Sequence, residues 1–154
     1  MEASDDRENG WARALALLPH GPGFRFVDEL TALEGGKNGR ARYAVRGDEL
    51  FLAGHFPDHP MVPGVILIEA LAQLAGVVAQ SDPLLAPWTD LRLAAVRSAK
   101  IAGAVVPGEI LEMEVRVTGR LGRLIQAEGT IRVGGRDVLT AGVVLSGEPG
   151  DGPS

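Results

Sequence analysis

The segment from Gly64 to Gln80, GVILIEALAQLAGVVAQ, constrains the fold more than any other part of the chain. It follows Pro63, and in a helix it would be apolar on every face apart from Glu69, Gln73 and Gln80. Such a helix must be surrounded by protein or lipid. Its 17 residues, at about 1.5 Å each, reach roughly 25 Å, short of the ~30 Å hydrocarbon core of a membrane. We therefore predict a buried helix in a soluble domain and no membrane span.

The rest of the chain predicts one short helix and several strands around this central helix. Residues 111–118 alternate apolar with polar side chains, which is the two-residue period of a half-buried strand. Similar or weaker patterns predict strands over residues 24–33, 40–45, 91–101, 124–133 and 137–145, and a helix over residues 11–18. A hairpin, one buried helix and then an antiparallel meander predict an α+β fold in which one sheet wraps around one helix.

Length and composition predict one globular domain. The chain has 154 residues, of which 45% are hydrophobic and 23% charged. We expect a flexible acidic tail over residues 1–10, a single domain over residues 11–146 and a second flexible tail over residues 147–154. The net charge of −5 disfavours nucleic acid as a partner. The absence of cysteine excludes disulfides and thiolate nucleophiles, and a cytoplasmic location is expected.

Glu69 is the most informative polar residue, because it interrupts the apolar helix. An isolated carboxylate among apolar neighbours is costly, so the group should either find partners or keep its proton. One interpretation is a structural carboxylate bonded to the backbone or to Gln73, one helical turn further on. The other is a general acid. The helix alone leaves the two evenly matched.

His55 precedes the helix in a stretch that is stiffened by prolines. His55 and His59 have the spacing of a helical metal pair, but Pro57 and Pro60 prevent the helix that this spacing requires, so we expect no metal site. A loop histidine that bonds a nearby carbonyl remains open. The alternative is an imidazole base, with the Gly64 amide at the helix N-terminus as a donor to a carbonyl oxygen. Base, acid and amide together suit proton abstraction beside a carbonyl.

These residues lie within a longer motif. The segment GHFPDHPMVPGVILIEALAQLAG resembles the signature of the beta-hydroxyacyl-acyl carrier protein dehydratases, which have the hotdog fold. Three further segments resemble the family in the same order: LPHGPGFRFVDEL, AVRSAKIAGAVVPGE and EILEMEVRVTGR. The resemblance runs from about Leu18 to Leu145, which is nearly the whole expected domain.

The resemblance implies a dehydratase site without metal or cofactor. In the family, the histidine and the helix carboxylate come from different subunits of a dimer, and the corresponding residues here are His55 and Glu69. Gly64 would hold the thioester carbonyl. The surrounding substrate-binding positions would be Phe56, Pro63, Val65 and Gln73. His20 and Asp28 also match family positions, but we interpret both as structural.

The resemblance also implies a partner and an assembly. The substrate would arrive on an acyl carrier protein, held by a phosphopantetheine arm, and the enzyme would be a homodimer or a trimer of dimers. Carrier proteins are acidic, so a basic docking patch is expected, with Arg97 and Lys100 as first candidates and Arg120 and Arg123 as weaker ones. The alternatives are a hotdog acyl-CoA or acyl-carrier thioesterase and a non-catalytic acyl-binding subunit.

Overall fold

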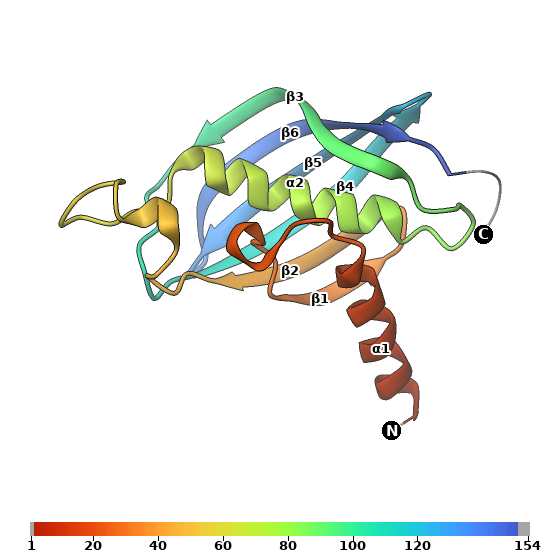
Figure 1. The fold of residues 1–154 in the computed structure, drawn as a ribbon, viewed down its shortest axis with the longest axis horizontal. Coiled ribbons are helices and arrows are strands. Elements are labelled where there is room, and N and C mark those ends of the chain that lie inside the picture. Colours follow the sequence, from red (N-terminus) through yellow and green to blue (C-terminus); the bar gives the residue numbers. More distant parts are fainter. Residues whose placement is uncertain (1, 151–154) are drawn as a thin grey trace.

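Helix α2 (Gly64–Gln80) lies against one face of a six-stranded antiparallel sheet that curves around it (Figure 1). The computed structural model describes residues 2–150. Its other elements are helix α1 (Glu2–Ala16), the 3-10 helices η1 (Pro22–Phe24) and η2 (Leu50–Leu52), and strands β1 (Glu29–Glu34), β2 (Asn38–Ala44), β3 (Thr89–Ile101), β4 (Ile110–Leu121), β5 (Leu124–Val133) and β6 (Arg136–Glu148). Within residues 2–150, no helix combines the length and the apolar character that a membrane span needs.

The strand order is β1-β2-β4-β5-β6-β3, so β1 and β3 form the two edges. Strands β4, β5 and β6 form the predicted meander. After β2 the chain passes through α2 and reaches β3 at the opposite edge, where β3 pairs with β6. This crossover places α2 across the sheet and confirms the predicted α+β arrangement.

The sheet and α2 are in close contact because their facing side chains are apolar or very small. In β4, Leu111, Met113 and Val115 are buried, as the alternating pattern predicts. Two glycines allow the closest approach. A β-carbon at Gly39 would lie 2.7 Å from Val78 Cγ2, and one at Gly129 would lie 2.8 Å from Leu71 Cδ1. Both separations are below van der Waals contact, so larger residues there would push α2 away from the sheet.

Two expectations for the N-terminal part are wrong. Residues 2–10, expected as a loose tail, form the first part of α1. The side chains of residues 3–10 are exposed, and the sequence there gives no apolar period from which a helix could be predicted, whereas Trp11, Ala14 and Leu15 pack on the core. The strand expected over residues 24–33 begins only at Glu29. Before it, the backbone N–H of Phe26 donates to a side chain of α2 instead of a neighbouring strand.

The C-terminal boundary also differs from the expected one. Strand β6 continues to Glu148, two residues beyond the expected end of the domain, because the backbone stays paired with β5 as far as Ser146 and with β3 as far as Glu148. The remainder of the expected tail, residues 151–154, lies outside the described residues.

Candidate active site

A cavity of about 390 Å³ lies beside α2 and includes Glu69 in its wall. Successive turns of α2 contribute Glu69, Gln73, Gly76 and Gln80. The opposite walls come from the segment after α1, from β3 with Trp88 just before it, and from β6. Their apolar residues are Leu17, Leu18, Trp88, Leu91, Leu93 and Leu145, and Asp90 and Arg92 also line the cavity. The cavity has the size of a small-ligand site, and its lining is mostly apolar with a few polar groups, among them Glu69.

The Glu69 carboxyl has two polar neighbours at this cavity. Its Oε1 atom lies 3.2 Å from His20 Nε2 and accepts a hydrogen bond of 3.2 Å from Gln73 Nε2. The side chains of His20 and Glu69 are 27% and 21% exposed, so this group is sheltered but still reachable. The contact with Gln73 is one of the two alternatives that the sequence left open for Glu69. The contact with His20 was not predicted, because His20 was expected to be structural.

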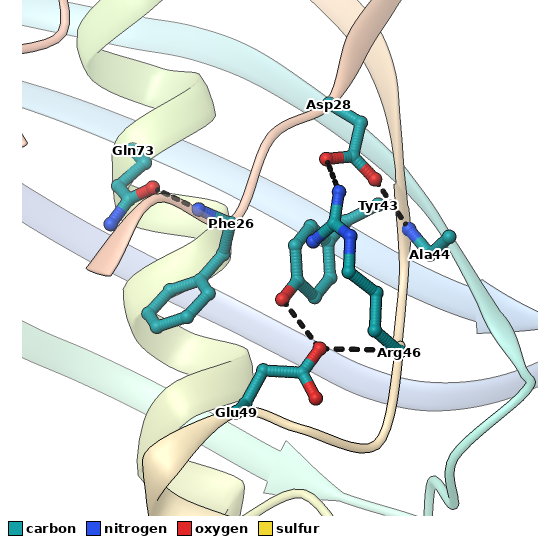
Figure 2. Close-up of polar contacts among 7 residues, drawn as sticks. All are labelled: Phe26, Asp28, Tyr43, Ala44, Arg46, Glu49 and Gln73. Atoms are coloured by element: carbon teal, nitrogen blue, oxygen red, sulfur yellow. Dashed lines mark hydrogen bonds and ion pairs between the residues drawn. The ribbon is translucent and has the colours of Figure 1, made fainter. Parts of the chain in front are cut away.

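Gln73 is buried and joins α2 to the segment that leads into β1 (Figure 2). Its Oε1 accepts the backbone N–H of Phe26 at 2.8 Å, and its Nε2 donates to the carbonyl of Phe24 at 2.9 Å. These two hydrogen bonds satisfy backbone groups that would be paired with a neighbouring strand if this segment were part of the sheet. Gln73 therefore fixes the chain beside the cavity and also contacts Glu69.

His55 lies in the irregular segment before α2, and its ring is held on one side. Nδ1 lies 2.9 Å from the carbonyl oxygen of Met61. A carbonyl oxygen only accepts, so Nδ1 carries the proton in this hydrogen bond and Nε2 of the neutral ring has the free lone pair. The ring also stacks on Phe56, with 4.0 Å between centroids. His55 therefore presents a nitrogen that can act as a base.

His55 is not among the described residues that line the Glu69 cavity. Gly64 opens α2 after Pro63, so its N–H belongs to the first turn, where backbone donors have no partner within the helix. Phe56 and Val65 are 50% and 71% exposed and are free to contact another molecule. Within one protomer, the predicted base and the predicted acid thus face different surroundings.

The predicted basic residues fall into two groups. Arg97 and Lys100 lie exposed on β3, and neither forms an ion pair within residues 2–150. Arg120 instead donates to the carbonyl of Ala79 at the end of α2, and Arg123 pairs with Glu148 at 2.8 Å. The last two are already engaged inside the protomer.

The segment that carries His55 is fastened at its start by a polar cluster that we call the Glu49 anchor: Asp28, Tyr43, Arg46 and Glu49 (Figure 2). Glu49 Oε1 accepts the Tyr43 hydroxyl and the Arg46 N–H, both at 2.8 Å. The Arg46 guanidinium reaches Asp28 at 2.6 Å. This cluster borders a second hollow, of about 570 Å³, but its members bond to one another, which is typical of a structural network.

The surroundings of the Glu49 anchor shift the pKa values of Glu49 and Tyr43. Burial acts to raise the pKa of Glu49, but donors from the backbone of Arg46 and Gly47 and from Tyr43 outweigh it, so the pKa lies below its usual range. Burial raises the pKa of Tyr43, and the adjacent Glu49 carboxylate raises it further. At neutral pH the anchor therefore consists of a neutral tyrosine and an ionised glutamate.

Comparison with known proteins places the chain in a family. The model of the FabA-like domain matches residues 18–142, so this chain belongs to the FabA-like domain family. It is 38% identical over 130 residues to a 3-hydroxyacyl-[acyl-carrier-protein] dehydratase FabZ of Anaeromyxobacter sp. (strain Fw109-5), with 81% of each chain covered. It is also 38% identical over 136 residues to the FabZ dehydratase of Xylella fastidiosa (strain M12), covering 86% of this chain and 84% of the relative.

Solved structures with low sequence identity share the fold. A chain of the dehydratase heterocomplex ApeI:P from Xenorhabdus doucetiae superposes with a TM-score of 0.71 at 18% identity, covering 90% of this chain and 91% of that one. A hypothetical thioesterase protein with coenzyme A from Streptococcus pneumoniae gives 0.62 at 16% identity, covering 79% and 85%. These likenesses confirm the predicted hotdog fold.

Proposed function

We propose that this chain is a lyase that removes water from 3-hydroxyacyl thioesters carried on an acyl carrier protein and yields trans-2-enoyl thioesters. One observation carries the proposal: in a chain 38% identical to FabZ dehydratases, Glu69 lies in the wall of an acyl-sized, mostly apolar cavity. The product would serve fatty-acid synthesis or a related acyl-chain pathway.

The proposed reaction uses three groups. His55 Nε2 removes the α-proton of the thioester, and the electrons of that C–H bond form the new double bond. The Gly64 N–H donates to the thioester carbonyl oxygen as it gains charge. Glu69 gives a proton to the 3-hydroxyl while the C–O bond breaks, so the oxygen leaves as water. The enzyme ends with a protonated His55 and an ionised Glu69, so before the next turnover His55 must give up its proton and Glu69 must regain one, directly or through water.

His55 lies outside the Glu69 cavity of its own protomer, so the proposed site needs a second copy of the chain. The exposed edge strand β3 is the surface that suits this pairing. It is 13 residues long, it leaves backbone groups unpaired on its outer side, and Leu93, Val96 and Ile101 on it are 37–53% exposed. A long edge of this kind pairs readily with another strand. We therefore propose a homodimer through β3, with trimers of dimers as a further assembly.

A mass measurement tests this assembly. Sedimentation of the wild-type chain should give a dimer or a multiple of it. Val96→Asp places a buried charge in the proposed interface and should shift the distribution towards folded monomer. A wild-type chain that sediments as a monomer at micromolar concentration contradicts the proposal.

We propose that the carrier protein docks on Arg97 and Lys100, because these exposed cations lie on a strand that lines the cavity. Arg120 and Arg123 remain secondary candidates, since each already has a partner in the protomer. Charge reversal of Arg97 and Lys100 to Glu should raise KM for the carrier-bound substrate while leaving KM for a short pantetheine thioester unchanged. An equal change for both substrates contradicts docking at these residues.

Carrier-dependent chemistry and the lack of cysteine lead us to expect a cytoplasmic enzyme.

The decisive assay is water elimination from a 3-hydroxybutyryl carrier-protein thioester, measured together with release of free thiol. Enoyl product without thiol supports the dehydratase. Thiol release without enoyl product supports a thioesterase, and neither product from the folded chain supports a non-catalytic acyl-binding subunit. His55→Ala and Glu69→Gln should each abolish most of the turnover. Near wild-type rates in either folded variant would overturn the assignment.

A further inference from the structure

Among the described residues, partners are found for only one of the two oxygens of the Glu69 carboxyl. Oε1 is the atom that lies 3.2 Å from both His20 Nε2 and Gln73 Nε2. Across residues 2–150, no side chain or backbone donor contacts Oε2. The two oxygens of the same carboxyl therefore differ in their surroundings, and the proposed reaction requires a proton on one of them.

Gln73 presents an N–H group to Glu69, and its own contacts determine this orientation. Its amide oxygen accepts the Phe26 N–H, and its amide nitrogen donates to the Phe24 carbonyl. Turning the amide over would set oxygen against a carbonyl and NH₂ against an N–H, so only one orientation satisfies both backbone groups. In that orientation Nε2 faces Glu69 Oε1 as a donor.

His20, which also lines the cavity, reaches the same oxygen. It follows Pro19 after α1, and its ring lies 6.3 Å from that of Phe24 in a stacked arrangement. Its Nδ1 is buried and has no hydrogen-bond partner among the described residues. A buried N–H without an acceptor is rare in proteins, which favours a lone pair on Nδ1 and the proton on Nε2. His20 thus also donates to Oε1.

We propose that His20 and Gln73 are positioning residues that hold Glu69 Oε1 as an acceptor and so leave Oε2 as the oxygen that carries and donates the reacting proton. The proposal rests on the dehydratase function proposed above. A proton on Oε1 would be repelled by the two N–H donors that face this atom, whereas a proton on Oε2 meets no such donor. As the Oε2–H bond breaks and water leaves, negative charge develops on the carboxyl, and the two hydrogen bonds to Oε1 strengthen. Their effect should therefore fall on kcat more than on KM.

Two substitutions at His20 separate positioning from packing. His20→Phe keeps a ring beside Phe24 but has no donor. His20→Gln keeps an N–H at about the same reach. We expect His20→Phe to lower kcat by about 10²-fold, in the range seen when one donor to a developing charge is removed, with KM changed less than about threefold. His20→Gln should recover a substantial part of the loss. Equal losses in two variants of equal thermal stability, or wild-type kcat in His20→Phe, would overturn the proposal.

The ring nitrogen of His20 that carries the proton can be identified by a measurement that does not depend on enzymatic activity. Nitrogen-15 NMR of the histidine rings, with His20 assigned by comparison with His20→Gln, should show a proton on Nε2 of His20. A spectrum in which Nδ1 is protonated and Nε2 is bare would overturn the proposal, because Nε2 could then not donate to Glu69. A wild-type chain that eliminates no water would instead overturn the proposed function, so the two failures are told apart.

Discussion

His55 Nδ1 donates to the carbonyl oxygen of Met61 at 2.9 Å, and this contact determines which ring nitrogen can act as a base. Met61 lies six residues along the chain, on the other side of a turn in which Met61 N also donates to the His55 carbonyl at 2.8 Å. The ring is thereby held with its proton on Nδ1 and its lone pair on Nε2. The same histidine serves as an anchor through one nitrogen and as the proposed base through the other.

His55→Asn tests these two roles separately. The asparagine amide can replace Nδ1 as a donor to Met61, but it has no group at the Nε2 position. We expect the loop to keep its structure and kcat to fall by about 10²–10⁴-fold, the usual contribution of a positioned base. Thermal unfolding and steady-state kinetics measure the two effects. A loss of stability that matches the loss of rate would show that His55 is mainly an anchor.

Gly64 allows a direct test of its backbone N–H. Gly64→Pro removes the donor at the first position of α2, where proline is tolerated, and Gly64→Ala is the matched control that keeps it. Either new β-carbon would lie about 2.4 Å from Ile101 Cδ1, so both variants must displace the same side chain. We expect Gly64→Pro to have a kcat about 10²–10³-fold below that of Gly64→Ala. Equal rates in the two variants would exclude the amide from catalysis.

Gly76 should control how long an acyl chain the cavity accepts. A β-carbon at Gly76 would lie 3.7 Å from Leu91 Cδ2, which is ordinary contact, so Gly76→Ala should fold and even gain about 0.5–1 kcal/mol in helix stability. Gly76→Leu places a large side chain in the part of the cavity that lies between α2 and β3. We expect it to lower kcat/KM for long 3-hydroxyacyl chains by about tenfold or more relative to 3-hydroxybutyryl substrate. A uniform loss for all chain lengths would contradict this role.

The Glu49 anchor should make stability depend on pH in the acid range. The pKa of Glu49 is lowered in the folded chain, so the unfolded chain binds more protons there. Its stabilisation is therefore complete above the unfolded value of about 4.5 and is lost as pH falls towards the folded pKa. Urea unfolding between about pH 6 and pH 3 should show a shallower decline for Glu49→Gln than for the wild type. Parallel curves would show that Glu49 is not a source of this dependence.

Most of the fold could be predicted from local patterns. Helix α2 spans the predicted residues because Pro63 and the turn after Gln80 mark its ends, and β4 follows its two-residue period. The first part of α1 could not be predicted, since the side chains of residues 3–10 are exposed and have no apolar period. The segment around Phe26 could not either, because its hydrogen bonds go to a side chain distant in sequence.

The sequence offers candidate site residues but not their contacts. His55, Gly64 and Glu69 stand in one motif, which is why the sequence predicts them together, and their roles remain predictions. The contact of His20 with Glu69 depends on how the end of α1 is folded against α2, and no local pattern reports that. The Glu49 anchor was not predicted for the same reason. The only hint in the sequence was Tyr43, the single tyrosine of the chain, and no local pattern indicates that its hydroxyl bonds Glu49.

The proposed reaction requires a base and an acid that come from different protomers. Mixing the two inactive variants His55→Ala and Glu69→Gln tests this directly, after unfolding and refolding them together so that subunits exchange. Each mixed dimer would contain one intact site, so random pairing should restore about a quarter of the wild-type rate of water elimination. A mixture that stays as inactive as the separate variants, although mixed dimers are shown to form, would contradict a shared site.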